Sequence, residues 1–332
     1  MDGFYVGDII GNSYTHENEK YNLKTKNFKL FTDRSKFSDD TILSFATIYW
    51  LLYTNHKPNE MIDVLKQFFK KYPDRNPTIY GESFVNWITN TKYNFRKSSG
   101  NGGAMRSSVI GWYASDMEEL RDLIYNAIMP THNDKRAIIA SEIVAVSIFL
   151  LKNNYTKEQL ISYIEKEYDY NLHEEMKSYK NKYTYTSDSK ETVRPALVAF
   201  IKSTSYEDSI RNAVSFGGDT DTITTINSSI AEAYYKEIPR DILNKAIKFL
   251  PDEFLLLLND YKVSCKKKNN KRVEGKWIIW KIKKKSCQVQ GFSAKNQFIE
   301  TSTQTIENTE FLISRFLHIW IKWFNLYRSY SI

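Results

Sequence analysis

Two short acidic segments, far apart in the chain, carry the residues best suited to chemistry. The first reads SDDT at residues 38–41, and the second reads GGDTDT at residues 217–222. Each directly precedes an apolar run, at 42–52 and 223–235, so each places two carboxylates and neighbouring hydroxyls in the first turn of an expected helix. Helix capping would explain either segment alone, because Asp, Ser and Thr oxygens accept the N–H groups that a helix start leaves unpaired. Adjacent Asp residues, however, exceed what one cap requires.

Four carboxylates would converge if these two helix starts meet in space: Asp39, Asp40, Asp219 and Asp221. Neither segment contains a Lys or Arg to neutralise them, and such a concentration of negative charge requires cations. All the donors are hard oxygens, without His or Cys, which favours magnesium, calcium or manganese over zinc. Two divalent ions would balance the four charges.

Helices are the elements expected to position these segments. In 223–235 the apolar residues recur at steps of three and four, typical of one buried helix face, whereas 42–52 is apolar nearly all round and is expected in the core. Gly217 and Gly218 allow a sharp bend before the later helix. Further helical patterns cover 58–72, 80–90, 116–129, 138–151, 156–168, 190–203, 205–216, 239–250 and 251–262. No convincing run of alternating strands interrupts them, so the sequence predicts an all-α domain.

A glycine-rich loop at 98–106 lies between these helices. It is not a dinucleotide fingerprint, because no strand precedes it and Met105 stands where the third glycine belongs. Its backbone N–H groups at a helix start are suited to binding phosphate. Arg106 could act there, or it could be an outward-facing structural residue. His132, in the segment THND at 131–134, is by itself most simply a turn residue beside a helix cap.

Charge divides the chain of 332 residues into two parts. The whole chain has a net charge of +8, but residues 264–332 hold 14 Lys and Arg against 4 Asp and Glu, which leaves residues 1–263 at a net −2. The sequence therefore predicts a catalytic domain at 1–263 and a basic, aromatic-rich C-terminal extension at 264–332. The extension could be a solvated appendage, or it could dock on a partner, on an anionic membrane surface or on nucleic acid.

Cysteine usage and the absence of targeting signals indicate the compartment. Cys265 and Cys287 both lie in the extension, which does not suggest a disulfide framework or a zinc site. The N-terminal segment lacks the features of a signal peptide, and no apolar run is long enough to span a bilayer. A cytoplasmic protein without a transmembrane segment is expected.

Five motifs, taken in order, resemble the ADP-ribosylglycohydrolase family, which includes the dinitrogenase-reductase-activating glycohydrolases. The matching stretches are GDIIG at 7–11, FSDDT at 37–41, GNGGAMR at 100–106, THN at 131–133 and GGDTDT at 217–222. The resemblance covers about residues 3–262. It implies a compact orthogonal multi-helix bundle, and a hydrolase that frees ADP-ribose from a modified side chain or a small conjugate with two magnesium ions.

The resemblance also implies a role for each matching residue. The metal ligands would be Ser38, Asp39, Asp40, Asp219, Asp221 and Thr222, with Mg²⁺ as the ion and Mn²⁺ as a substitute. Gly100, Asn101, Gly102 and Gly103 would line the diphosphate or ribose, and His132 would contact ADP-ribose near the phosphates. Cleavage at the anomeric carbon passes through an oxocarbenium-like state. Two metals can orient the ribose hydroxyls and hold an attacking water, which assigns Asp39, Asp40 and Asp219 to the catalytic centre.

The sequence departs from the family pattern at two places. Related sequences often carry a Glu shortly after the first Gly-Asp motif, where this chain has Thr15, with Glu17 and Glu19 just beyond. The family Glu is thought to position the substrate or the attacking water, and we assign this role to Glu17. Ser99 stands where many members have an aromatic residue before the glycine loop, and Phe95 could replace it. Because of the first departure, a non-catalytic module that binds ADP-ribose or a related nucleotide is the alternative function, and a purely structural relative, as in eye-lens crystallins, is a third.

Overall fold

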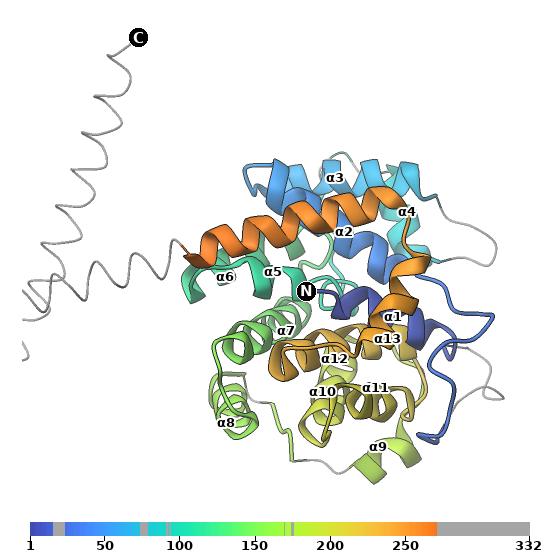
Figure 1. Ribbon diagram of the computed structural model, residues 1–332. Coiled ribbons are helices and arrows are strands. Elements are labelled where there is room, and N and C mark those ends of the chain that lie inside the picture. The colour runs from blue at the N-terminus through green and yellow to red at the C-terminus, as the bar shows by residue number, and fades with distance from the viewer. Residues whose placement is uncertain are drawn as a thin grey trace, which may run out of the picture. The chain divides into compact units, whose positions relative to one another are not determined.

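The computed structural model describes residues 1–15, 24–73, 79–90, 92, 94–168, 170–173 and 176–270 (Figure 1). They belong to the first of the two units into which the chain divides, Met1–Arg272. Its helices are α1 (Gly3–Asn12), α2 (Asp39–Tyr53), α3 (Pro58–Lys71), α4 (Glu82–Asn90), α5 (Ser108–Tyr113), α6 (Met117–Ile128), α7 (Lys135–Lys152), α8 (Lys157–Tyr168), α9 (Met176–Lys182), α10 (Ser189–Ile201), α11 (Tyr206–Val214), α12 (Thr220–Tyr235), α13 (Arg240–Ala246) with a 3-10 turn at Ile247–Phe249, and a last helix at 252–270. The described residues contain no sheet, only an isolated antiparallel bridge between Gly100 and Asp188. The prediction of an all-α fold is confirmed.

Several helix bounds differ from those expected. The helices α5 and α9, of 6 and 7 residues, were not predicted because neither is long enough to show a repeating apolar pattern. The last helix continues to residue 270 instead of ending at 262, so the expected domain boundary at 263 falls inside it.

Helix α12 is the element on which the acidic segments depend. It contacts α1, α7, α10 and α11, which surround it in Figure 1. Every residue from Thr220 to Ala233 is buried, so the one-sided burial expected of this helix is wrong. Its many Thr, Ser and Ala side chains are small enough to let neighbouring helices approach on all sides.

Helix α1 lies against α12 with almost no side chain between the two backbones. Three glycines of α1, spaced four residues apart, face carbonyl oxygens of α12. A Cβ atom on Gly7 would lie 2.3 Å from the Thr224 oxygen, and one on Gly11 would lie 2.3 Å from the Thr220 oxygen. Only glycine permits this approach, which brings the C-terminal end of α1 to the start of α12.

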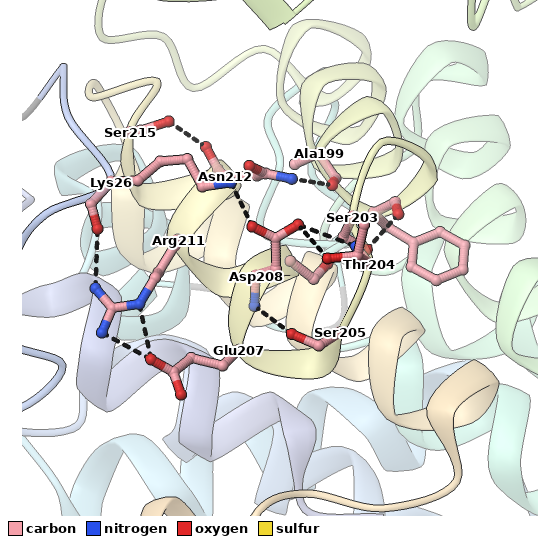
Figure 2. A network of polar contacts seen from close by, with 12 residues as sticks. Lys26, Ala199, Ser203, Thr204, Ser205, Glu207, Asp208, Arg211, Asn212 and Ser215 are labelled. Carbon is pink, nitrogen blue, oxygen red and sulfur yellow. Dashed lines mark hydrogen bonds and ion pairs between the residues drawn. The ribbon is translucent and has the colours of Figure 1, made fainter.

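A polar network holds the chain segment around Lys26 on helix α11 (Figure 2). The guanidinium of Arg211 donates to the carbonyl oxygens of Lys26 and Phe28, each at 2.9 Å, while the Lys26 ammonium pairs with Asp208. Asp208 also accepts the backbone N–H of Thr204 at 3.0 Å. The chain that leads into α2 is therefore fixed to the helix that precedes α12.

The last helix, at 252–270, packs onto the helices near the N-terminus. The ring of Phe254 stacks on Phe45 of α2 with the centroids 4.1 Å apart. Lys262 forms an ion pair with Asp2 at 2.7 Å, and Lys268 forms one with Glu119 of α6. Cys265 is 1% exposed. The first residues assigned to the extension, up to 270, thus contact the body directly.

Residues 271–332 lie outside the described part of the chain. The docking of the extension on a partner, membrane surface or nucleic acid therefore stays a prediction. Among the helices that are described, none combines the length and the low polarity needed to cross a bilayer.

Candidate active site

The two acidic helix starts meet, although 182 residues separate them. The hydroxyl of Thr222 in α12 faces Oδ1 of Asp40 in α2, with 3.4 Å between the two oxygens. Asp40 is 2% exposed, whereas Asp39 beside it is partly exposed. Burial raises the pKa of Asp40 well above its usual range, and so do the nearby carboxylates, Asp221 and Asp219 among them. The convergence expected from the sequence is present.

Asp8 of α1 ties the start of α2 to the rest of the site. Its carboxylate accepts the backbone N–H and the hydroxyl of Ser38, both at 2.8 Å, and the backbone N–H of Thr41 at 3.1 Å together with the Thr41 hydroxyl at 2.5 Å. Burial, with a contribution from Asp221, raises the pKa of Asp8 to about 7. The sequence motif around Asp8 did not lead to a role for this residue. The sequence signal for such a role was the position of Asp8 between Gly7 and Gly11, the glycines that pack against α12.

The start of α12 is shaped by a glycine turn and by Thr15. Gly217 and Gly218 have φ values of 71° and 75°, a left-handed conformation that glycine adopts at little cost. The Thr15 hydroxyl accepts the backbone N–H of Asp221 at 2.7 Å and shares a hydrogen bond with the Thr220 hydroxyl at 2.8 Å. Thr15, at the position where related sequences often have Glu, is therefore a capping residue here.

Glu17 lies within residues 16–23, outside the described part of the chain, and its catalytic assignment stays a prediction. The residues on either side of that gap are both held at the start of α12. Thr15 bonds to Asp221, and the Lys24 ammonium donates to the carbonyl oxygen of Phe216.

The glycine-rich loop lies directly beside the acidic site. Asn101 is 8% exposed, and its side-chain amide donates to Oδ2 of Asp219 at 2.6 Å. The Asn101 backbone N–H donates to the Ser187 oxygen at 2.8 Å, next to the bridge between Gly100 and Asp188. The loop is thus anchored on both sides, and Asn101 contacts a carboxylate of the acidic site. The assignment of Gly100, Asn101, Gly102 and Gly103 to substrate binding stays a prediction.

The next two glycines of the loop pack against His132 and the core. A Cβ on Gly102 would lie 3.2 Å from Nε2 of His132, so the imidazole lies over the loop. A Cβ on Gly103 would instead meet Ser141 at 2.8 Å and Ile128 at 2.9 Å. No side chain would fit at either place without displacing a neighbour.

His132 is a buried, neutral imidazole. It is 5% exposed, and its Nδ1 lies 2.7 Å from the hydroxyl of Thr131. Burial lowers the pKa of His132 well below its usual range, and the positive charges of Arg106 and Arg96 lower it further. The ring can therefore offer one hydrogen-bond donor and one acceptor, but no charge, to a ligand at the loop.

Arg106 points into the core, so both of the roles considered for it from the sequence are wrong. It is 1% exposed, and its guanidinium donates to the carbonyl oxygens of Gly102 at 3.2 Å and Ala127 at 3.0 Å, and to the Thr131 hydroxyl at 2.8 Å. Burial lowers the pKa of Arg106 to about 9, which leaves it positively charged at neutral pH. Its guanidinium is therefore enclosed by protein acceptors.

The donor set fits a hard divalent cation. Oδ2 of Asp40 is buried without a hydrogen-bond partner, and burial with nearby carboxylates raises the pKa of Asp219 well above its usual range. In the part of the chain that is described, no group of three or more His, Cys, Asp or Glu side chains is arranged so that it could hold a metal ion by itself. Mg²⁺ usually takes one or two carboxylates and keeps several waters, and the oxygens of Ser38 and Thr222 are further ligands of the type it prefers.

The comparisons with known proteins identify the family and the fold. The family model described as ADP-ribosylglycohydrolase matches residues 1–266. The chain belongs to the ADP-ribosylglycohydrolase family. The solved structure described as "ADP-ribosylglycohydrolase-related protein complex" is similar in fold, with a TM-score of 0.60 and 22% sequence identity over 79% of this chain and 95% of that chain. No curated protein sequence matches the chain significantly. The resemblance inferred from five motifs is confirmed, and with it the multi-helix bundle and a hydrolase activity of this family's type.

Proposed function

We propose that this ADP-ribosylglycohydrolase cleaves the glycosidic bond between ADP-ribose and a modified protein side chain or a small conjugate, and that it needs two Mg²⁺ ions, or Mn²⁺ in their place. The meeting of the two acidic helix starts carries the proposal, and two further observations support it. Buried carboxylates from α2 and α12 converge, an oxygen of Asp40 lacks a partner, and the loop that holds Asp219 is rich in backbone N–H groups suited to phosphate.

Residues at the starts of α2 and α12 would bind the ions together. Ser38, Asp39 and Asp40 would bind from one side, and Asp219, Asp221 and Thr222 from the other. When bound, the ions supply charge neutralisation, an activated water and oriented ribose hydroxyls. Asp8 and Asn101 keep these residues in place by hydrogen bonds, which is the usual task of the residues around metal ligands.

The remaining site residues suit the diphosphate. The loop at 100–103 is joined to Asp219 through Asn101, and the neutral imidazole of His132 lies over Gly102 of the same loop. This arrangement would bind the phosphates while the ribose reaches the carboxylates.

A non-catalytic module that binds ADP-ribose is the second candidate. Thr15, at the position where related sequences often carry Glu, is engaged with the backbone of Asp221 and offers no base. Metal-assisted binding of ADP-ribose in calorimetry, together with no release of ADP-ribose from any substrate, would favour this candidate.

The test is incubation with Arg-, Ser- and nucleotide-linked ADP-ribose, with Mg²⁺ and with a chelator. We expect release of ADP-ribose from at least one substrate in Mg²⁺ only. Asp219→Asn should lower the rate by about a hundredfold or more, as for the loss of a main electrostatic element. Asp252→Asn, on the exposed side of the last helix, is the matched control. Unchanged turnover in Asp219→Asn and in chelator would refute the proposal.

A further inference from the structure

Arg106 is a fully buried cation that the proposed reaction does not use. Among the described residues, its hydrogen-bond acceptors are carbonyl, hydroxyl and thioether atoms, without a carboxylate. A buried charge without a counter-ion costs free energy. Arg106 bonds to Gly102 and to Thr131, and both of these residues lie next to the imidazole of His132. These contacts indicate how the buried charge can act on the site.

The hydroxyl of Thr131 connects Arg106 to His132. The Thr131 oxygen accepts from Arg106 at 2.8 Å, since a guanidinium can only donate. Its single hydrogen then has two acceptors within reach: Nδ1 of His132 at 2.7 Å and the Ile128 oxygen at 3.2 Å. The Ile128 oxygen already accepts the backbone N–H groups of Thr131 at 3.1 Å and His132 at 2.9 Å. The shorter contact, to the less occupied acceptor, therefore takes the hydrogen.

We propose that Arg106 and Thr131 are positioning residues that hold His132 as the Nε2–H tautomer, so that the imidazole donates a hydrogen bond to the diphosphate of the substrate. With Nδ1 accepting from Thr131, the proton of the neutral ring is on Nε2. Nε2 and the neighbouring Cε1 both lie over Gly102, at 3.2 and 3.1 Å from a Cβ atom added there, and Nε2 would be 3.8 Å from a Cβ atom added to Gly100. This inference rests on the proposed function, in which the loop at 100–103 binds the phosphates.

The same arrangement makes the loop selective for an anion. Phosphate oxygens only accept at neutral pH, so a ring that presents Nε2–H binds them, whereas a ring that presents a lone pair repels them. Arg106 adds a positive potential behind the loop, and its bond to the Gly102 oxygen at 3.2 Å fixes the peptide there. The guanidinium would not touch the bound anion. It would therefore contribute a positive potential at the loop without forming an ion pair with the anion.

The test is the tautomer of His132, read by long-range ¹H–¹⁵N NMR on the full-length protein at neutral pH, with the resonances assigned by comparison with His132→Asn. We expect wild type to carry the proton on Nε2. Thr131→Val keeps the shape but removes the hydroxyl, and it should give a mixture of tautomers and weaken ADP-ribose binding about tenfold, the loss of one hydrogen bond to a charged group. Thr131→Ser retains the hydroxyl, so it should have the wild-type tautomer and the wild-type affinity for ADP-ribose.

Arg106→Lys is the second variant, since one ammonium cannot bond to Gly102 and Thr131 as a guanidinium does. We expect it to shift the tautomer in the same direction as Thr131→Val. Protonation of Nδ1 in wild type would overturn the inference even if neither variant folds. An unchanged tautomer and affinity in Thr131→Val would also overturn it. Nε2–H in wild type without any turnover would instead reject the proposed function and leave this inference standing.

Discussion

The side-chain amide of Asn101 donates a hydrogen bond to Oδ2 of Asp219 at 2.6 Å, although 118 residues separate the two in the chain. This bond joins the loop expected to bind phosphate to the carboxylates expected to bind metal. Because both halves of the substrate site meet at one contact, a change there should affect binding and rate together.

Asn101→Ala should lower kcat/KM by about 10- to 100-fold, because Asp219 loses the donor that orients it. Thr192→Val is the matched control, since it removes the other oxygen bonded to the Asn101 amide, at 3.1 Å, and leaves Asp219 untouched. Steady-state kinetics on the substrate that shows turnover would check this. Equal effects in the two variants would contradict a specific role for the Asp219 contact.

Asp40→Asn should be at least as stable as wild type in the absence of divalent ions, because it removes a buried negative charge with an unpartnered oxygen. Wild type should gain melting temperature when Mg²⁺ is added, since a ligand that binds only the folded state stabilises it. The variant should show little or no gain. Scanning calorimetry with and without Mg²⁺ measures both effects, and an equal gain in the two proteins would exclude Asp40 as a ligand.

Gly7→Ala should destabilise the fold by about 1–3 kcal/mol or more, because its Cβ would lie 2.3 Å from a backbone oxygen of α12, which cannot move away freely. Gly81→Ala is the control, since nothing lies within 4 Å of the added atom. Urea unfolding of both variants gives the comparison. A loss of stability in Gly81→Ala as large as in Gly7→Ala would argue against close helix contact as the cause.

The ion pair between Glu119 and Lys268 should make the attachment of the last helix depend on pH. Burial raises the pKa of Glu119, but hydrogen bonds from Lys268 and from the backbone of Ser115 outweigh it, so the net pKa is lowered. A lowered folded-state pKa means that the contribution to stability is present above the ordinary pKa of Glu and is lost as the pH falls below it. The difference in unfolding free energy between wild type and Glu119→Gln should therefore shrink between about pH 5 and pH 3.

Glu118→Gln is the control for that experiment. Glu118 lies in the same first turn of α6 but is exposed. The free energy of unfolding of Glu118→Gln should differ little from that of wild type at every pH. If the difference in unfolding free energy between wild type and Glu119→Gln grew as the pH fell, the ion pair could not be the source of the stability.

The helices and the acidic site could be predicted because their signals are local. Apolar spacing along 223–235 and paired Asp residues at 39 and 40 need no knowledge of distant residues. The hydrogen-bond partners of Asp8 and Arg106 could not be predicted, because folding brings them close from distant parts of the chain. Asp8 binds the start of α2 only because α1 packs on α12, and Arg106 turns inward because Gly102 and Thr131 supply acceptors there.

The continuation of the last helix to residue 270 was not predicted, for a related reason. The Lys residues at 266–268 suggested a solvated segment by composition alone. Lys268 nevertheless pairs with Glu119, and its ammonium lies 3.9 Å from the ring centre of Tyr113, while Cys265 is buried. Charge count along the chain does not reveal which few of several lysines find partners across the fold.

The bare glycine face of α1 has a consequence for how the protein is made. Gly3, Gly7 and Gly11 leave the ribosome long before the backbone they fit, which belongs to α12, more than 200 positions later. Until that helix has been synthesised, α1 cannot be seated and Asp8 cannot organise the carboxylates around it. The reaction centre can therefore form only after α12 has been translated. Fragments that stop before this helix are expected to be inactive, however much of the remaining bundle they contain.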